Sequence, residues 1–357
     1  MGGGGAERQL AYLSGELRLL GHDVHVAIGS HGVNFARLAS SGAEVHHVGS
    51  ASNHDVRLLY RVIRVIQTVK PDLVHTWLTQ MDIMGGLAAR ITGVPWVCSE
   101  RSGPAAYPPT FKNRLRRHLG RRASAVIANS DMGDAFWCDI LPSATPRFVI
   151  PNGVPLAEID ETPPIVMAGG QDTALLLFAG RLADVKSPGT LIDALAHLAP
   201  DPSWSAIVFG DGPLGPRLDG DIDRAGLAGR VTRRGFTPDL WGWMKRATAF
   251  ISPSLFEGHP NTVIEAMAAG CPLIVSDIPA HRSFLDGTLA ELVAPGQPAL
   301  LAAAIARVLV EPAERRARAA RARSAAARFS TRETAHRHAD AYEAVVRHRH
   351  SPGRGDR

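Results

Sequence analysis

Two basic side chains follow an apolar run in the second half of the chain. Gly180 and Arg181 come directly after residues 175–179, and Lys186 lies five positions beyond Arg181. If the run is a parallel strand, both cations lie at the carboxyl end of a sheet, where ligands of open α/β sheets bind. Fixed cations at that position suit a diphosphate, and the alternative is an ordinary pair of solvated surface charges.

A second polar segment begins at Glu257 and reads EGHPNTVIE, followed by AMAAG. Pro260 is typical of an early helical position and Gly270 of the position after a helix, so we predict a helix over residues 260–269. The first turn of a helix carries free backbone N–H groups and the positive end of the helix dipole, which together bind anions. We therefore expect an anion site at Asn261, Thr262 and Val263.

Two carboxylates bracket this predicted helix start. Glu265 lies about one turn inside the helix, and a carboxylate can accept two hydrogen bonds from a diol such as ribose. Glu257 precedes the helix. A carboxylate beside a helix N-terminus also stabilises the helix itself, which is the commoner explanation for a single example. Both carboxylates together with Arg181 and Lys186 favour a nucleotide diphosphate site.

A short glycine loop, Gly210-Asp211-Gly212, follows the next apolar run. Glycine at a strand end allows the backbone to approach a ligand closely, or simply makes the turn. The loop alone therefore does not distinguish a binding site from a structural turn.

Short apolar runs alternate with helical patterns along most of the chain. Runs without strict polar alternation are typical of parallel strands that helices cover on both faces. The runs predicted as strands are residues 24–28, 73–76, 95–98, 125–128 and 148–150, then 175–179, 206–209, 231–236, 249–251 and 273–275. Residues 161–172 are rich in Pro and Gly, which predicts a linker. The fold class is therefore α/β, with two doubly wound parallel-sheet domains.

The predicted domains are residues 1–154 and 155–329. The segment from 300 to about 348 is predicted to be helical, and its last part, residues 330–350, is expected to form a helix that returns to the first domain. Residues 351–357 form a polar tail. A length of 357 residues supports two domains, because a single core tends to stop growing at about 250 to 300 residues.

Composition excludes several classes of protein. The three cysteines are far apart and lack a CxxC pattern, which indicates neither a disulfide framework nor a structural zinc site. We find no metal-ligand cluster, no spanning segment and no signal peptide, so we expect a cytoplasmic protein without a metal or other cofactor. The net charge of +5 permits attraction to phosphates or anionic lipid, and nothing indicates a nucleic-acid partner.

The motifs together resemble those of the retaining glycosyltransferases of family 4, the group 1 type with a GT-B fold. The residues that carry the resemblance are Gly180-Arg181, Lys186, Gly210-Asp211-Gly212, Gly235-Phe236, Ser252-Pro253-Ser254 and the segment from Glu257 through Gly270. The resemblance implies two Rossmann-like domains that face each other across a cleft. It also implies that Arg181 and Lys186 hold the donor diphosphate, Glu265 the ribose, and Glu257 the donor sugar.

The resemblance extends to the first half of the chain. Gly4 and Gly5 open a segment that is similar to the glycine loop of the family, which faces the donor, and Asn152-Gly153-Val154 is similar to its interdomain crossing. His75 follows a buried run, at a place where the family often has a His-x-His pattern; here the second position is Trp77. His75 is therefore either a catalytic residue or a hydrogen-bonded histidine at a strand end. Glu100 and Arg101 either line an acceptor pocket or form a surface ion pair.

The implied reaction transfers a sugar from a nucleotide diphosphate sugar, with retention of configuration, to a glycan, lipid-linked or small-molecule acceptor. The setting implied is the synthesis of cell-surface polysaccharide or glycoconjugate. The leaving diphosphate gathers charge, which Arg181, Lys186 and the start of the helix would stabilise. One alternative is a sugar-nucleotide binding protein without turnover. A nicotinamide-dependent dehydrogenase fits poorly, because no acidic residue ends the run 24–28.

Two further expectations concern a surface and the chain start. Residues 111–122 read FKNRLRRHLGRR, which predicts either peripheral contact with an anionic membrane or a solvated helix face. Relatives of the family begin with an apolar strand before the glycine loop, whereas here Met1 is followed at once by glycines. We therefore expect that the first domain lacks its opening strand and that further strand residues are encoded before Met1.

Overall fold

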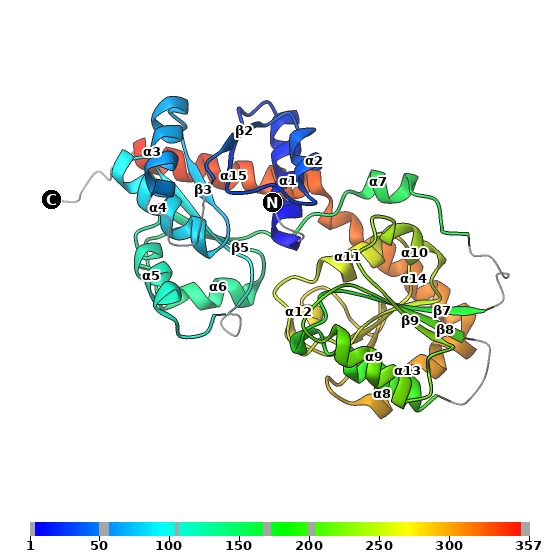
Figure 1. Cartoon of the computed structure of the whole chain (residues 1–357). Helices are drawn as coiled ribbons and strands as arrows, with labels where there is room; N and C mark the ends of the chain where they lie inside the picture. Colours follow the sequence, from blue (N-terminus) through cyan, green and yellow to red (C-terminus); the bar gives the residue numbers. More distant parts are fainter. Residues whose placement is uncertain (1–3, 50–56, 104–106, 167–172, 199–203, 351–357) are drawn as a thin grey trace. The chain divides into compact units, whose positions relative to one another are not determined.

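A computed structural model of the chain describes residues 4–49, 57–103, 107–166, 173–198 and 204–350 (Figure 1). The contacts between residues divide the chain into two compact units. Unit 1 comprises residues 1–153 together with 329–357, and unit 2 comprises residues 154–328. Each unit has its own parallel sheets and its own apolar core.

Unit 2 is built on a six-stranded parallel sheet with the strand order β12-β11-β10-β7-β8-β9. Its strands are β7 (Ala174–Ala179), β8 (Trp204–Phe209), β9 (Val231–Arg234), β10 (Ala249–Ser252), β11 (Leu273–Ser276) and β12 (Glu291–Val293). The central strands β7, β8, β10 and β11 are buried along nearly their whole length, because helices cover both faces. This explains why their sequences are continuous apolar runs.

The helices of unit 2 are α7 (Leu156–Glu161), α8 (Pro188–Ala196), α9 (Gly215–Arg224), α10 (Leu240–Arg246), α11 (Asn261–Ala268), α12 (Pro279–Arg282), α13 (Pro298–Val310) and α14 (Pro312–Ala326). The helices α8 to α12 connect successive strands, α7 precedes the first strand, and α13 and α14 follow the last. A short 3-10 helix, η2 (Asp184–Lys186), follows β7. Figure 1 shows α8, α9 and α13 on one face of the sheet and α10, α11 and α14 on the other. The loops that follow the strands therefore meet at one edge of the sheet.

Unit 1 contains two separate parallel sheets. The strands β1 (His25–Ile28) and β2 (Glu44–His47) form one, and the second has the order β3 (Val74–Thr76), β4 (Trp96–Glu100), β5 (Ala125–Ala128) and β6 (Arg147–Val149). Within the described residues, no backbone ladder joins β1 to β3. The sheet of unit 1 is thus divided at this point.

The helices of unit 1 surround these sheets. They are α1 (Gly5–Leu19), α2 (Phe35–Ala39), α3 (Arg57–Val69), α4 (Thr79–Thr92), α5 (Phe111–Gly120), α6 (Asp131–Cys138) and α15 (Thr331–His350). The last of these, α15, packs against α1, where Leu13 and Leu17 meet Ala335 and Ala339. In the part of the chain that the structure describes, no helix combines the length and apolar character that a membrane crossing requires.

The structure differs from the predicted elements at several places. The strands β2 and β12 were not predicted, because EVHH is polar and ELV is too short to form a recognisable run. The helix predicted to begin at Pro260 begins at Asn261, and Pro260 is its N-cap. The strand predicted to reach Phe236 ends at Arg234, and the helical C-terminal segment breaks at Pro312 and again near Phe329.

Candidate functional site

The loops that follow β7 and β8 pack directly against each other. The amide of Gly180 donates to the carbonyl of Phe209 at 3.1 Å, and the amide of Leu182 donates to the carbonyl of Asp211 at 3.0 Å. Gly210 has a φ of +131°, and a Cβ there would collide with the carbonyl oxygen of Gly180. A Cβ at Gly212 would collide with the backbone of Leu182. Both glycines are therefore required by the close approach of the two loops, with or without a ligand.

Lys186 and Glu257, which the sequence predicted to share a site, form an ion pair. The Lys186 Nζ lies 2.5 Å from the Glu257 Oε1. The same oxygen accepts a hydrogen bond of 2.7 Å from the Ser254 hydroxyl. A backbone hydrogen bond of 2.9 Å from Leu255 to the carbonyl of Val185 holds the two loops together. Tertiary pairing of the loops after β7 and β10 thus brings a cation and a carboxylate into contact across 71 positions of sequence.

A buried histidine that the sequence analysis missed lies near this pair. His281, on α12, is fully buried, and its Nδ1 donates to the carbonyl of Ser276 at 2.7 Å. Burial is the main cause that lowers the pKa of His281, and the charge of Lys186 lowers it further, while Glu257 and the Ser276 hydrogen bond act in the opposite direction. The ring is therefore neutral at pH 7. Among the described residues, its Nε2 has no hydrogen-bond partner.

The start of α11 differs in one respect from the predicted anion site. The amide of Val263 donates to the carbonyl of Pro260 at 3.1 Å, and its side chain is fully buried. Val263 therefore does not offer a free amide in this structure, because the first turn closes on Pro260. Asn261 and Thr262 precede this hydrogen bond and remain the candidate amides at the N-terminus of the helix.

Glu265 is fully buried on α11. Its Oε2 accepts a hydrogen bond of 3.2 Å from the indole Nε1 of Trp241, which lies on α10. A buried carboxylate needs hydrogen-bond donors, and the indole supplies one. Trp241 was not singled out from the sequence, because a tryptophan inside a helical pattern is usually a core residue.

Two of the predicted donor-binding residues are exposed. Arg181 is exposed after β7, and no described residue pairs with its guanidinium. The Phe236 ring is 68% exposed in the loop after β9. An exposed aromatic ring offers a face for stacking.

Gly4 and Gly5 form the start of α1 in unit 1. Gly4 is the N-cap residue, and its amide donates to the Glu7 carboxylate at 3.0 Å, which is the half of a capping box that a glycine can form. Gly5 is the first helical residue. In the structure, the segment that resembles the glycine loop of the family forms the N-terminus of α1.

His75 has partners at both ring nitrogens. Its Nδ1 lies 2.7 Å from the Tyr342 hydroxyl and accepts from the Trp77 indole at 3.3 Å, and its Nε2 lies 2.7 Å from the Ser99 hydroxyl. Burial lowers the pKa of His75 well below 6.5, and the charges on His338 and Arg101 lower it further. These contacts favour the hydrogen-bonded strand-end histidine over the catalytic residue, because both nitrogens already have partners within unit 1.

Neither reading of Glu100 from the sequence describes its position. The side chain is fully buried and pairs with Arg116 at 3.0 Å; it also accepts from the Trp137 indole at 3.0 Å and the Tyr107 hydroxyl at 2.8 Å. Glu100 is thus part of a buried network and neither lines a pocket nor forms a surface ion pair. Arg101 hydrogen-bonds to Asn152, and burial lowers its pKa to about 10.

One group of side chains in unit 1 has the composition of a metal site. His25, Glu44 and His46 place one possible ligand atom each within 4.8 Å of one another. The sequence analysis expected no metal-ligand cluster. It did not recognise this group, because the three residues are 19 and 2 positions apart and match no familiar ligand spacing. In unit 2, the residues expected to hold the donor include no such cluster within the part that the structure describes.

Two family models match most of the chain between them. The model of the group 1 glycosyl transferases matches residues 173–311, and the model of glycosyltransferase family 4 matches residues 3–158. The first covers the loops of Arg181, Lys186, Glu257 and Glu265, and the second covers most of unit 1.

Curated relatives are similar over part of their length. The chain is 31% identical over 217 residues to the lipopolysaccharide core biosynthesis mannosyltransferase LpcC of Rhizobium leguminosarum, which covers 56% of this chain and 59% of that protein. It is 25% identical over 263 residues to the UDP-Gal:alpha-D-GlcNAc-diphosphoundecaprenol alpha-1,3-galactosyltransferase of Escherichia coli, which covers 67% of each. The similarity thus spans about three fifths to two thirds of these two relatives.

Solved structures are similar over nearly the whole chain. HepE of Anabaena, crystallised with UDP-glucose, superposes with a TM-score of 0.83 at 22% identity and covers 96% of each chain. The lipopolysaccharide outer core galactosyltransferase WaaB superposes with a TM-score of 0.72 at 19% identity, also over 96% of each chain. The chain belongs to the group 1 glycosyltransferases of family 4, and its fold is the GT-B fold, with two Rossmann-like parallel-sheet domains and C-terminal helices.

Proposed function

We propose that the chain is a retaining glycosyltransferase that transfers a sugar from a nucleotide diphosphate sugar to a glycan, lipid-linked or small-molecule acceptor in the synthesis of a cell-surface glycan. The observation that carries this proposal is the contact between Lys186 and Glu257, on loops that follow β7 and β10. Arg181 is exposed in the same loop as Lys186, and α11 follows the loop of Glu257. These groups lie on loops at the carboxyl edge of one sheet, where such ligands bind.

The diphosphate is the leaving group, and its charge rises as the bond to the sugar breaks. Arg181 and Lys186 are positioned to stabilise that charge, since a preorganised cation lowers the barrier without reorganising during the reaction. The amides of Asn261 and Thr262 at the helix start add partial positive charge. This set of donors makes a metal unnecessary for holding the diphosphate.

Glu257 has a positioning role in this proposal. An ammonium group has three N–H donors, and Lys186 uses one of them for Glu257. The remaining two are available for phosphate oxygens while Glu257, held by Ser254, fixes the position of the nitrogen. The other carboxylate oxygen of Glu257 can accept from a sugar hydroxyl, which agrees with the role that the family resemblance implies.

The nucleoside would lie between Glu265 and Phe236. One oxygen of Glu265 accepts from Trp241, and a ribose hydroxyl would hydrogen-bond to the same carboxylate. Access to this carboxylate requires a shift of its surroundings, since Glu265 is fully buried without a ligand. Phe236 offers an exposed ring face on which a base could stack.

We propose a UDP-sugar as the donor and a lipid-linked or polysaccharide acceptor. HepE was crystallised with UDP-glucose, and the Escherichia coli relative is named for UDP-galactose and a diphosphoundecaprenol-linked acceptor. UDP-glucose and UDP-galactose are therefore the first donors to test, followed by GDP-mannose because LpcC is a mannosyltransferase.

The test measures donor hydrolysis and nucleotide binding separately. Arg181→Ala and Lys186→Ala should lower turnover by roughly 100-fold or more, the usual scale for removal of one charge stabiliser. Arg217→Ala is the matched control, because its exposed guanidinium lies on α9 and pairs only loosely with Asp221 at 3.7 Å. Near-normal turnover in the Arg181 and Lys186 variants would contradict the assignment, and nucleotide binding without any turnover would favour the binding-protein alternative.

We further propose that the exposed basic face of α5 contacts an anionic membrane. Phe111 is 80% exposed at the start of this helix, and Arg114, Arg117 and the following Arg121 are exposed as well. Arg116 does not contribute to this face, because it is buried against Asp82 and Glu100. Co-sedimentation with phosphatidylglycerol vesicles should therefore fall at high salt and in a Phe111→Ser/Arg117→Ser variant, and binding that ignores lipid charge would contradict the proposal.

A further inference from the structure

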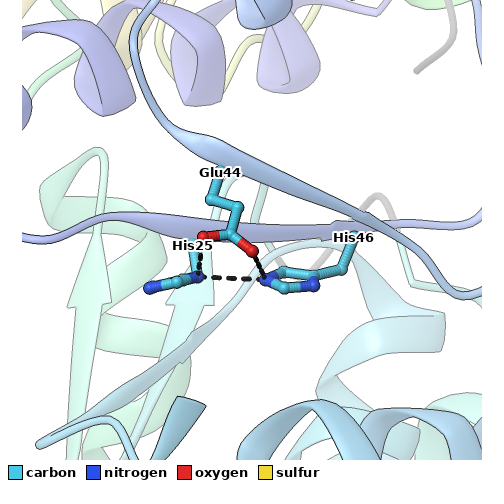
Figure 2. Close-up of side chains that lie close together, drawn as sticks. All are labelled: His25, Glu44 and His46. Atoms are coloured by element: carbon cyan, nitrogen blue, oxygen red, sulfur yellow. Dashed lines mark hydrogen bonds and ion pairs between the residues drawn. The ribbon is translucent and has the colours of Figure 1, made fainter. Parts of the chain in front are cut away.

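The pairing of β1 with β2 places three possible metal ligands on one face of a two-stranded sheet. His25 lies opposite Glu44, and Ala27 lies opposite His46. Because side chains alternate between the two faces of a strand, His25, Glu44 and His46 share a face. Figure 2 shows the two imidazoles and the carboxylate converging on one point.

The separations between the three side chains are near those of ligands around a metal ion, and the shortest of them, between His25 and His46, is also a hydrogen bond. The His25 Nδ1 lies 3.0 Å from the His46 Nε2 and 3.6 Å from the Glu44 Oε2, and the His46 Nε2 lies 3.7 Å from the Glu44 Oε1. In a tetrahedral zinc site with bonds of about 2.0 to 2.2 Å, neighbouring ligand atoms are roughly 3.3 to 3.5 Å apart. Separations of 3.6 and 3.7 Å are too long for hydrogen bonds. The carboxylate therefore faces both rings without hydrogen-bonding to either, as it would around an ion.

A second carboxylate orients the first histidine. The Nε2 of His25 lies 3.1 Å from the Asp23 Oδ2, and the Asp23 Oδ1 accepts a hydrogen bond of 3.0 Å from Arg18. With the proton of His25 on Nε2, the lone pair of Nδ1 points at His46 and Glu44. Metal-bound histidines characteristically donate their other ring nitrogen to a carboxylate in this way. Arg18 fixes the carboxylate in turn.

We propose that His25, Glu44 and His46 bind a divalent first-row transition ion, with zinc as the best fit. Two imidazoles and one carboxylate suit Zn²⁺, whereas Ca²⁺ and Mg²⁺ prefer sites made entirely of oxygen ligands. The Glu44 side chain is 66% exposed, and each imidazole retains about a fifth of its surface, so the ion can enter and keep a water ligand. All three residues belong to unit 1 and none is among the residues proposed to hold the donor.

The site would cross-link β1 to β2. An isolated two-stranded sheet is marginally stable, and the described part of unit 1 shows no ladder that joins this pair to the other strands. An ion held by one residue of β1 and two of β2 would add a bond across the pair. The expected consequence is slower amide hydrogen exchange in both strands when zinc is bound.

The experiment uses the full chain without a polyhistidine tag, stripped of metal, and titrates it with zinc by calorimetry. His46→Gln and Glu44→Gln should each weaken zinc binding by about 10-fold to 100-fold or more. Asp23→Asn, which alters only the orienting carboxylate, should weaken it by about 10-fold to 100-fold. His47→Gln is the matched control, because His47 lies on the other face of β2 and contacts His31 at 3.1 Å. Cobalt bound in place of zinc should give visible absorption bands of a tetrahedral site, and the His46 variant should lose them.

Three outcomes would overturn the proposal. These are zinc binding that is equal in native protein, His46→Gln and Glu44→Gln; binding lost only in His47→Gln; and no binding by the native chain. Circular dichroism of each variant verifies folding, and Glu44→Gln decides the matter if a histidine variant unfolds, because the Glu44 side chain is mostly exposed.

Discussion

His338 should make unit 1 sensitive to acid, and His338→Gln tests this. The ring is buried on α15, and its Nδ1 donates to the carbonyl of Thr334 at 2.8 Å. The pKa of His338 is lowered to about 3, mainly by burial; the Thr334 hydrogen bond acts in the opposite direction, and the charges of Arg101 and Arg337 contribute to the lowering. Folding therefore keeps the ring neutral at pH values where the unfolded chain would protonate it.

The sign and size of the effect follow from the two pKa values. In the unfolded chain the ring has a pKa near 6.5. Above pH 6.5 the ring is neutral in both states, so His338 does not lower the free energy of unfolding there. As the pH falls from 6.5 toward 3, the unfolded state binds a proton at this ring and the folded state does not. The free energy of unfolding therefore falls by about 1.4 kcal/mol per pH unit. At pH 5 the loss at His338 is about 2 kcal/mol. His75 and His281, whose pKa values burial also lowers, add to the total in the native chain.

The assay is urea unfolding followed by tryptophan fluorescence, at pH 7.5 and pH 5.0. At pH 7.5 His338→Gln should cost no more than about 1 kcal/mol, since glutamine can still donate to a carbonyl. Between the two pH values, the variant should lose about 2 kcal/mol less stability than the native chain. His118→Gln is the control, because His118 is exposed on α5. Equal losses in the native chain and in His338→Gln would refute the reasoning.

Three further predictions concern single contacts, each read by chemical or thermal unfolding. Gly210→Ala should destabilise unit 2 by roughly 2 to 3 kcal/mol, because its positive φ and the neighbouring carbonyl exclude a Cβ; Gly180→Ala, whose Cβ would have ordinary contacts, should cost clearly less. Arg116→Met should cost about 3 to 5 kcal/mol because it leaves two buried carboxylates without their cation, whereas the exposed Arg117→Met should be nearly neutral. Trp241→Phe should cost about 1 to 3 kcal/mol, since it removes a donor from a buried carboxylate; an unchanged unfolding midpoint would show that this hydrogen bond contributes nothing.

Much of the site in unit 2 could be predicted because its residues follow strands. The loops after parallel strands share one edge of the sheet, so the positions of Arg181, Lys186 and Glu257 relative to that edge follow from the order of apolar runs alone. The sequence also indicated that Lys186 and Glu257 share a site, and the structure has them in contact. Their roles in holding the donor stay predictions, as do those of Glu265 and Phe236.

Other features could not be predicted, because they depend on contacts between segments far apart in sequence. His281 lies near the Lys186–Glu257 pair only after β11 and α12 fold beside β10, and Trp241 reaches Glu265 only through the packing of α10 on α11. The prediction of a free amide at Val263 was wrong for the same reason. Nothing in the sequence shows that the first turn of α11 closes on the carbonyl of Pro260.

The sequence by itself determined the α/β class, the doubly wound organisation and the family, because apolar periodicity and motif spacing are local properties of the chain. Only the tertiary structure decided which ionisable groups are buried and what they contact. In the sequence, Glu100 follows an apolar run and Arg116 lies in a basic helical segment. The core nevertheless encloses both side chains, which form an ion pair. His25, Glu44 and His46 meet only through the register of β1 on β2. A residue's type fixes which group can ionise, but its surroundings, and therefore its charge and its chemistry, depend on which distant segments pack around it.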